Sequence, residues 1–416
     1  MRILYCTQYF PPEIGAPAER AREMVRHLAK EGHEVVVLTA FPNYPSGRLQ
    51  KGYGLGLFQK EAYAGAVVLR SFVWTNPRKS FVGRVGNYLS FASSSLLSGF
   101  LGAGRGFDVV VGSSPPLFAA ASARLLAIRH RAPFVFDVRD VWPEAAVALG
   151  QLGNPLFRRF GFALADRLYR AADCIICANP GNRDLIEKRL SAETNGRMAI
   201  VPNGTNVHIF KPLEPRERAR VRAELGFEDR FVVLYAGLHG LMYDWDALLD
   251  AADSLRDDPS ILFVLLGDGP MKAEIVENAT RRGLINIRFK APLPATRAAR
   301  LMSAADVGML SMRDLEFFRD TVPVKLYDYM AVGLPVVHSG GGFAKQITEE
   351  AGSGLCFSPG DGPALARAIR DLSKRTDERS AISARARELV TRRFDRSVLA
   401  KAFEKELLGA ISGKVP

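Results

Sequence analysis

Cysteine, histidine and long apolar runs are all scarce in this chain. Its 416 residues include four Cys, too few for a disulfide framework, and reduced thiols suit a cytoplasmic protein. Cys174 and Cys177 form a C-x-x-C inside an apolar run, which predicts a buried strand, whereas a redox pair would favour a strand-to-helix turn. No stretch approaches the ~20 continuous apolar residues that span a bilayer. Arg2 is followed directly by a strand-like run where a signal peptide would have its apolar region, so we expect a cytoplasmic protein.

Several common binding and catalytic motifs are absent. The sequence has no G-x-G-x-x-G, no G-x-x-x-x-G-K-[ST] and no G-x-S-x-G, which argues against a dinucleotide fingerprint, a P-loop and a nucleophile elbow. It has no H-E-x-x-H, and its six His are scattered, so nothing indicates zinc. The chemistry of the protein must therefore come from other patterns.

Basic residues outnumber acidic ones, and the excess lies in the first half. Lys and Arg total 56 against 44 Asp and Glu, a net charge of +12. Residues 1–205 carry 25 basic and 15 acidic side chains, and residues 206–416 carry 31 and 29. A basic half indicates an anionic partner, such as a membrane surface, a nucleic acid or a phosphate-bearing substrate. We expect no nucleic acid, because basic and aromatic residues do not interleave in one stripe.

Short apolar runs alternate with amphipathic stretches along the chain. Ile3–Cys6 predicts a strand, Pro17–Glu31 a helix and Glu34–Leu38 the next strand, and the alternation restarts at Phe231–Tyr235. Strands that are apolar on both faces and joined by helices are typical of a parallel sheet covered on both sides. We therefore predict an α/β protein with two doubly wound, Rossmann-like domains.

The domain boundary is expected after the turn Pro202-Asn203-Gly204, where a polar connector follows. This gives an N-terminal domain over residues 1–205 and a C-terminal domain over residues 206–395. The segment 396–416 has no strand after it, and we expect its helix to cross back onto the first domain.

Glycine-rich loops follow the first strand of each domain. Gly15 precedes the first helix, and Gly237 and Gly240 follow Phe231–Tyr235. Glycine lets a phosphate approach the backbone at a helix N-terminus, and open α/β sheets bind ligands at the carboxyl ends of their strands. Ordinary turn chemistry remains an alternative for each loop.

The stretch from Asp320 to Val337 combines a polar loop, a short helix and a strand. Asp320 and Asp328 are eight residues apart, so they do not belong to one solvated helix face. Lys325 is expected near the start of the helix, where the macrodipole disfavours a cation unless an anion faces it. The alternative is a loop carboxylate with a surface lysine.

These patterns resemble the retaining glycosyltransferases of family 4, which have the GT-B arrangement of two Rossmann-like domains facing across a cleft. A further segment, Arg139–Glu144, is similar to the transferases for N-acetylfucosamine-type sugars that build bacterial surface polysaccharides. The signatures that carry the family resemblance are Tyr9-Phe10-Pro11-Pro12 with Gly15, Val201-Pro202-Asn203-Gly204, Gly267-Asp268-Gly269-Pro270 and Thr321–Ala331.

The resemblance implies roles for the residues of the donor site. Asp328 would bind the ribose hydroxyls and Asp320 would contact the donor sugar, although both are one methylene shorter than the Glu of the family pattern. Lys325 would lie near the diphosphate, and Gly15 would approach it from the first domain. Such enzymes need no metal cofactor, because cations and helix ends neutralise the leaving diphosphate.

The loop after Gly237 departs from the family pattern. Many members carry Arg and Lys there, whereas this chain has Leu238 and His239. The diphosphate would then depend on Lys325, on backbone N–H groups near Gly240 and on His239.

Asp140 is the candidate carboxylate for the acceptor. It follows a predicted strand, so it is expected at the carboxyl edge of the sheet, where it would orient the acceptor hydroxyl or accept its proton. Arg139 would pair with Asp140 or hold an acceptor phosphate. Asp137 and Glu144 are rivals for the same role, and a salt bridge between the domains is the other explanation of Asp140.

Together the residues and the resemblance predict a metal-independent, retaining transferase of hexosyl or N-acetylhexosaminyl groups. The donor is expected to be a UDP-linked sugar and the acceptor a lipid-linked saccharide in polysaccharide, O-antigen or capsule synthesis. A nucleotide-sugar 2-epimerase and a non-catalytic sugar-nucleotide-binding module are the alternatives.

The segment Asn76–Gly106 contains no Asp or Glu. It either forms a core helix or rests on the anionic inner face of the cytoplasmic membrane, which would suit a lipid-linked acceptor. We therefore expect a cytoplasmic protein that is peripheral on that membrane. The basic residues of the segment are Arg78, Lys79, Arg84 and Arg105, and the apolar residues at helical spacing are Phe81, Val85, Tyr88, Leu89, Leu96 and Phe100.

Overall fold

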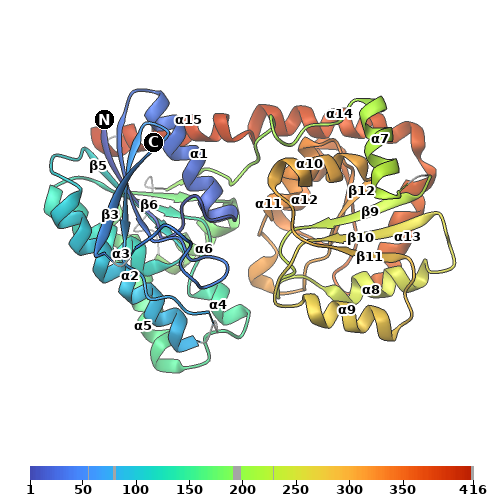
Figure 1. The fold of residues 1–416 in the computed structure, drawn as a ribbon, viewed down its shortest axis with the longest axis horizontal. Helices are drawn as coiled ribbons and strands as arrows, with labels where there is room; N and C mark the ends of the chain where they lie inside the picture. The colour runs from blue at the N-terminus through green and yellow to red at the C-terminus, as the bar shows by residue number, and fades with distance from the viewer. Residues whose placement is uncertain (55, 78–80, 191–197, 228, 414–416) are drawn as a thin grey trace. The chain divides into compact units, whose positions relative to one another are not determined.

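The structure is a computed structural model and describes residues 1–54, 56–77, 81–190, 198–227 and 229–413. The chain divides into two compact units (Figure 1). Unit 1 comprises Met1–Asn203 and Arg396–Pro416, and unit 2 comprises Gly204–Asp395. The first boundary thus lies two residues before the expected position after residue 205, and the C-terminal segment is part of unit 1.

Unit 1 is built on an eight-stranded sheet with the order β3-β4-β2-β1-β5-β6-β7-β8, in which β3 is antiparallel to β4 and the other pairs are parallel. The strands are β1 (Arg2–Cys6), β2 (Glu34–Ala40), β3 (Phe58–Tyr63), β4 (Ala66–Ser71), β5 (Val109–Ser114), β6 (Phe134–Val138), β7 (Cys174–Cys177) and β8 (Met198–Ile200). The helices are α1 (Ala16–Lys30), α2 (Phe81–Gly102), α3 (Leu117–His130), α4 (Glu144–Ala148), α5 (Pro155–Ala171), α6 (Pro180–Leu190) and α15 (Arg396–Ser412).

The helices of unit 1 cover both faces of its sheet (Figure 1). Helices α1 and α15 pack side by side on one face, and α2, α3 and α5 form the layer on the other. Leu399, Phe403 and Leu407 of α15 are buried in the same core as Ile3 and Tyr5 of β1. Burial of this apolar stripe explains why the last helix belongs to unit 1.

Unit 2 is built on a six-stranded, all-parallel sheet with the order β11-β10-β9-β12-β13-β14. The strands are β9 (Phe231–Ala236), β10 (Ile261–Leu266), β11 (Ile287–Lys290), β12 (Val307–Leu310), β13 (Val336–His338) and β14 (Gly354–Cys356). The helices are α7 (Pro215–Leu225), α8 (Trp245–Ser254), α9 (Lys272–Arg281), α10 (Ala295–Ala304), η1 (Glu316–Phe318), α11 (Val324–Ala331), α12 (Gly342–Ala351), α13 (Gly362–Lys374) and α14 (Thr376–Arg393).

The two sheets confirm the predicted α/β class with two doubly wound halves. Cys174 and Cys177 are buried, free thiols in β7, as the buried-strand interpretation required. Strand β3 was not expected, because its residues FQKEAY contain no apolar run and lie at an exposed sheet edge.

Among the described helices, none has the length and apolar character needed to cross a membrane.

Candidate functional site

The loop after β9 packs closely against the loop after β10. His239 donates its backbone N–H to the carbonyl of Asp268 at 2.9 Å, and Met271 donates to the carbonyl of His239 at 3.1 Å. A Cβ at Gly269 would lie 2.5 Å from the backbone oxygen of His239, so only glycine permits this approach. The Gly-Asp-Gly segment therefore fixes the position of the first loop of unit 2.

Gly237 makes room for a lysine. Its φ of 128° is a conformation that side chains disfavour. A Cβ at Gly237 would lie 3.2 Å from both Cε and Nζ of Lys325. The glycine predicted to admit a phosphate thus brings the β9 loop against the lysine predicted to neutralise that phosphate.

Lys325 lies in the first turn of α11, and its ammonium group contacts aromatic rings. Nζ is 3.7 Å from the ring centroid of Tyr235 and 4.1 Å from that of Tyr243. The atom is buried and donates no hydrogen bond among the described residues. Burial holds the pKa of Lys325 well below its usual value, although Asp328 opposes this shift. The site therefore contains a desolvated amine that has no anionic partner in direct contact among the described residues.

His239, in the loop after β9, is the second side chain of this site whose polar atoms have no hydrogen-bond partner among the described residues. Its ring is fully buried, and neither Nδ1 nor Nε2 has a hydrogen-bond partner in the described structure. The ring packs against Tyr235 and Trp245, with centroids 5.5 and 5.2 Å apart. Burial, with further contributions from Lys272 and Lys325, lowers the pKa of His239 to about 4, so the imidazole is neutral near pH 7.

Asp328 lies one turn after Lys325 on the same helix and is almost fully buried. Its Oδ1 accepts a hydrogen bond from the hydroxyl of Thr205 at 2.5 Å. A carboxylate that accepts one hydroxyl here has the chemistry to accept ribose hydroxyls.

Asp320 lies in the loop before α11 and is exposed. Its carboxylate contacts the backbone at Gly342, where α12 begins and where a Cβ would clash with it. The positive end of the helix dipole favours a negative charge at that position. Asp320 thus lies beside a helix N-terminus, and its predicted contact with a donor sugar stays a prediction.

Gly240 does not have the predicted free donor. Its N–H already donates to the carbonyl of Leu238 at 2.9 Å, and the N–H of His239 is bound to Asp268. These two N–H groups thus have backbone acceptors, and the expectation that N–H groups near Gly240 bind a diphosphate stays a prediction. The adjoining Asp244, the first carboxylate of a D-x-D sequence, caps α8 by accepting from the N–H of Ala247 at 3.0 Å.

In unit 1, Gly15 immediately precedes α1, whose N-terminus has no side-chain cap. The glycine lines a cavity of about 180 Å³ together with Tyr9 and Tyr44. The loop is fixed by Glu13, whose buried carboxylate accepts from the N–H groups of Asn43 and Tyr44, each at 2.8 Å. Unpaired N–H groups at a helix start beside a small cavity suit an anion.

Asp140 lies just after β6, and its side chain is exposed. The preceding Arg139 is buried, and it donates from Nε and Nη2 to the carbonyls of Ser114 and Pro115 at 3.0 and 2.9 Å. Arg139 therefore anchors the loop that presents Asp140, and its predicted contact with an acceptor phosphate is untested.

The two rival carboxylates are already paired. Asp137 is fully buried and accepts from Nη2 of Arg20 at 2.9 Å and from the hydroxyl of Ser113 at 3.0 Å. Glu144 pairs with Arg189 at 2.7 Å. These contacts leave Asp140 as the exposed acid of the three.

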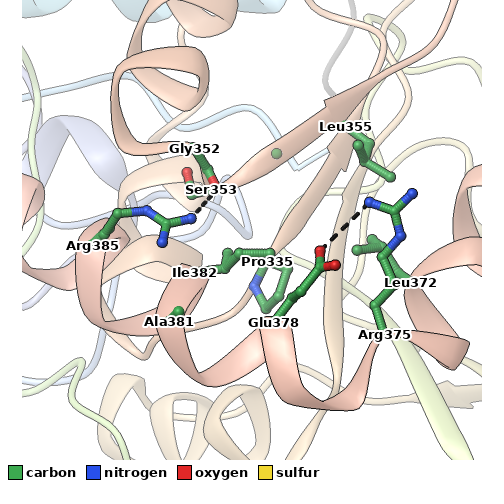
Figure 2. A pocket seen from close by; sticks show the side chains of 11 residues that line it. Pro335, Gly352, Ser353, Leu355, Leu372, Arg375, Glu378, Ala381, Ile382 and Arg385 are labelled. Carbon is green, nitrogen blue, oxygen red and sulfur yellow. Dashed lines mark hydrogen bonds and ion pairs between the residues drawn. The ribbon is translucent and has the colours of Figure 1, made fainter.

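A larger cavity, of about 380 Å³, lies elsewhere in unit 2, where β13 and β14 begin (Figure 2). Gly237 follows the carboxyl end of β9, whereas this cavity lies at the amino ends of β13 and β14. Because the strands are parallel, the cavity and Gly237 lie at opposite ends of the strands. Figure 2 shows Arg385 donating a hydrogen bond to the backbone and Arg375 paired with Glu378. The guanidinium of Arg385 is 3.2 Å from the carbonyl oxygen of Gly352, and that of Arg375 is 3.6 Å from the carboxylate of Glu378. With its charged groups paired, the cavity is a poor candidate for the diphosphate.

Two glycosyltransferase sequence families match consecutive parts of the chain. A glycosyl transferase 4-like domain matches residues 15–204, and the glycosyl transferases group 1 match residues 217–389. The chain belongs to the family-4 glycosyltransferases. It is therefore an enzyme that transfers glycosyl groups, and its two doubly wound domains are those of the GT-B fold.

Relatives of this glycosyltransferase extend over its whole length. Glycosyl transferase WcaI of Escherichia coli strain K12, named for colanic acid biosynthesis, is 28% identical over 98% of this chain and 100% of its own. The structure of Anabaena HepE with UDP-glucose has a TM-score of 0.71 at 17% identity, covering 98% of this chain and 100% of that one. WaaG, a glycosyltransferase involved in lipopolysaccharide biosynthesis, has a TM-score of 0.66 at 16% identity, covering 97% and 99%.

Of the residues predicted for the donor, the structure brings Gly237, His239 and Lys325 together around one tyrosine, with Asp328 on the next turn. Gly15, Arg139 and Asp140 belong to unit 1. The sequence interpretation missed the aromatic side chains of the site. They are Tyr235, Tyr243 and Trp245, and the aromatic density of the segment YDW following Gly237 was the available signal.

Proposed function

We propose that this glycosyltransferase moves a sugar from a UDP-linked donor to a lipid-linked saccharide, with retention of configuration, in bacterial surface-polysaccharide synthesis such as that of O-antigen or capsule. The observation that carries the donor proposal is the pair of buried, unpartnered groups, Lys325 and the imidazole of His239, beside Asp328. The HepE structure with UDP-glucose and the likeness to WcaI support the donor and the polysaccharide.

The proposed chemistry needs negative charge to be stabilised on the leaving group. The bond from the anomeric carbon to the diphosphate breaks, and a bond from that carbon to the acceptor oxygen forms. Lys325 neutralises charge on the departing diphosphate, and no metal cofactor takes part. The proton of the acceptor hydroxyl passes to Asp140 or to the departing phosphate.

A thermal-shift screen against UDP-, GDP- and ADP-sugars tests the donor. At a ligand concentration of 100 times Kd, binding stabilises the folded state by about 2.7 kcal/mol. We expect a shift with UDP-sugars that is smaller in Asp328→Ala and kept in Asp246→Ala, an exposed carboxylate on α8. A shift with GDP- or ADP-sugars alone would overturn the choice of UDP, and release of an epimerised sugar nucleotide without acceptor would favour the epimerase.

The membrane part of the proposal is supported by helix α2, which packs with its small residues inward. Ser94, Ser95 and Ser98 are buried, and the hydroxyl of Ser94 donates to the carbonyl of Phe72 at 2.5 Å. The large apolar side chains lie outside: Leu97 is 44% exposed and Leu101 66%. A water-facing helix normally buries such residues, so this orientation indicates contact with an apolar medium.

Two neighbouring helices extend this apolar surface. Phe100 of α2 lies under the guanidinium of Arg129 of α3, 4.5 Å from its ring centroid. Ile128 of α3 is 55% exposed and Leu156 of α5 is 76% exposed. We call the exposed apolar residues of the three helices the α2–α3–α5 surface: Val82, Leu89, Leu97, Phe100, Leu101, Leu125, Ile128, Leu156, Phe157 and Phe160.

The charge of the same helices complements anionic lipid. Helices α2, α3 and α5 carry seven Arg and one acid, Asp166, which pairs with Arg189 at 2.5 Å. Apolar residues and cations together are the features of an interfacial surface. The expected cations Arg78 and Lys79 lie outside the described residues, and of the expected apolar set, Leu89 and Phe100 are exposed while Val85, Tyr88 and Leu96 are half-buried.

Flotation with liposomes tests the membrane surface. We expect the protein to float with anionic vesicles at low salt and less at 1 M salt, where the Debye length is ~3 Å. The double variant Phe100→Ser/Ile128→Ser should remain in the bottom fraction with the unbound protein. The control variant Ile285→Ser changes an apolar residue of unit 2 that is 85% exposed, and it should float like the wild type. Wild-type protein that stays below anionic vesicles at low salt would refute the assignment.

A further inference from the structure

The ammonium group of Lys325 lies between two aromatic faces at the start of α11. Its Nζ is 3.7 Å from the ring centroid of Tyr235 and 4.1 Å from that of Tyr243. A buried ammonium without a hydrogen-bond acceptor is costly, and an aromatic face compensates part of that cost through its quadrupole. Asp328, one turn away, adds a longer-range attraction.

The two rings are held in place by contacts of their own. The hydroxyl of Tyr235 donates to the carbonyl of Leu238 at 2.5 Å. Tyr243 forms a backbone bridge with Met312, and the next residue, Asp244, donates its N–H to the carbonyl of Ser311 at 2.9 Å. The edges of these rings meet each other and Trp245 at centroid distances of 4.8 to 5.8 Å. The rings therefore form a fixed frame around Nζ.

The remaining side of the ammonium faces Gly237. A Cβ there would lie 3.2 Å from Nζ, and the glycine itself is exposed. An anion that reaches Gly237 is thus next to an ammonium whose loss of hydration is offset only in part by the two rings and by Asp328. Since Nζ itself is buried, the attraction between them is stronger than between two groups at an open surface.

We propose that Tyr235 and Tyr243 are positioning residues, which hold the ammonium of Lys325 against Gly237 in the absence of an anion and present it to the donor diphosphate. This inference rests on the proposed donor function. The two rings supply the electrostatic support that a second fixed cation cannot give, because they attract the ammonium where another cation would repel it.

Tyr243 offers a matched pair of variants. Tyr243→Leu removes the ring face and keeps an apolar side chain, whereas Tyr243→Phe removes the hydroxyl and keeps the ring. By calorimetry we expect the Leu variant to bind UDP about tenfold more weakly, or about 1.4 kcal/mol, and to bind uridine as the wild type does. The Phe variant should bind UDP within about twofold of the wild type, because the cation–π contact is retained.

Two further readouts separate positioning from a general loss of structure. In a Lys325→Met background, Tyr243→Leu should weaken UDP binding no further, since the ring has no ammonium to hold. As pH rises, the UDP affinity of Tyr243→Leu should fall at a lower pH than that of the wild type, because the ammonium loses its proton more readily. Equal losses for UDP and uridine, or an undiminished loss in the Lys325→Met background, would overturn the proposal.

The aromatic frame around Nζ, formed by the rings of Tyr235 and Tyr243, can also be tested if the donor assignment fails. Wild-type protein that binds no nucleoside diphosphate would refute the proposed function. The ε-CH2 resonance of Lys325 then decides the placement of the side chain by NMR. An upfield ring-current shift that persists in Tyr243→Phe and becomes smaller in Tyr243→Leu, where the ring of Tyr235 remains, supports the aromatic frame. A resonance at the position of an exposed lysine overturns it.

Discussion

The ion pair between Arg20 of α1 and Asp137 of β6 provides a test of how unit 1 is held together. Nη2 of Arg20 donates to Oδ1 of Asp137 at 2.9 Å, and Nη1 donates to the carbonyl of Pro202 at 2.7 Å. The two side chains are 1% and 0% exposed. The perturbation is Arg20→Met, which removes the charge and the hydrogen-bond donors of the guanidinium, including Nε, which donates to Oδ2 of Asp137 at 3.4 Å, while retaining much of the apolar volume.

The structure sets the expected magnitude. After Arg20→Met, the buried carboxylate of Asp137 retains the hydroxyls of Ser113 and Tyr5, at 3.0 and 3.4 Å. Breaking a buried pair in this way costs about 3–5 kcal/mol of folding free energy, because the remaining charge is uncompensated. The double variant Arg20→Met/Asp137→Leu removes both charges and should regain part of that loss.

A pair with the same separation but greater exposure serves as the control. Arg2 and Glu34 are also 2.9 Å apart, with side chains 31% and 61% exposed. Solvent screens that attraction, so Glu34→Gln should cost less than about 1 kcal/mol. The contrast between the two pairs isolates the effect of burial from that of distance.

Hydrogen exchange of the β5 and β6 amides is the suitable assay, because a chain with two units need not unfold in a single transition. We expect protection to fall in Arg20→Met by the amount given above and to recover partly in the double variant. Protection within about 0.5 kcal/mol of wild type in Arg20→Met would refute the reasoning. So would a double variant less protected than either single variant.

Three further predictions concern the proposed reaction. Asp140→Asn should lower sugar transfer by ~10²–10⁴ in a radiolabelled-donor assay without changing donor affinity, and equal transfer rates would make Asp140 structural. Asp328→Ala should weaken nucleoside diphosphate binding by ~1.5–3 kcal/mol in calorimetry, and unchanged affinity would remove the ribose assignment. Because burial lowers the pKa of His239 to about 4, the free enzyme carries a neutral imidazole near pH 6, and a diphosphate nearby should raise that pKa. Binding should then take up protons and strengthen as pH falls from 7 towards 5, as measured in buffers of different ionisation enthalpy; His239→Gln should abolish this uptake.

The sequence predicts the central strands of the two sheets, because each is a short apolar run and helical stretches separate most of these runs along the chain. Phe231–Ala236 and Ile261–Leu266 are buried throughout and pair in parallel. Strand β3 was missed because it lies at the edge of its sheet and its sequence, FQKEAY, contains no apolar run.

The candidate site is only partly visible in the sequence. The position of Lys325 near a helix start indicated a facing anion, whereas the structure places two tyrosine rings there. Those rings come from β9 and from the loop before α8, more than 80 residues earlier in the chain. Local pattern cannot predict a contact of this range, which depends on the order of strands β9 and β12 in the sheet.

Helix α2 illustrates a different limit. Periodicity identifies which residues share a helix face but assumes that the large apolar face is buried. In α2 the close approach of α3 requires small residues, and the hydroxyl of Ser122 on α3 donates to the carbonyl of Ala92 at 3.0 Å. A Cβ at Gly99 would lie 2.8 Å from Leu126. The steric demand of that contact leaves the large residues outside.

The distribution of charge agrees with the two proposed ways of binding anions. Residues 1–205 carry a net +10, and helices α2, α3 and α5 contribute seven Arg to that half, many of them exposed. Residues 206–416 carry only +2, yet this half contains the residues proposed to bind the donor. A domain whose basic and acidic residues nearly balance can attract a diphosphate when a cation at the binding site is desolvated, because the interaction gains strength as the local dielectric falls. Salt should therefore weaken lipid binding at the proposed arginine surface far more than diphosphate binding at the proposed contact with Lys325. The two proposed sites would then bind anions in different ways, the first through many exposed cations and the second through one buried cation.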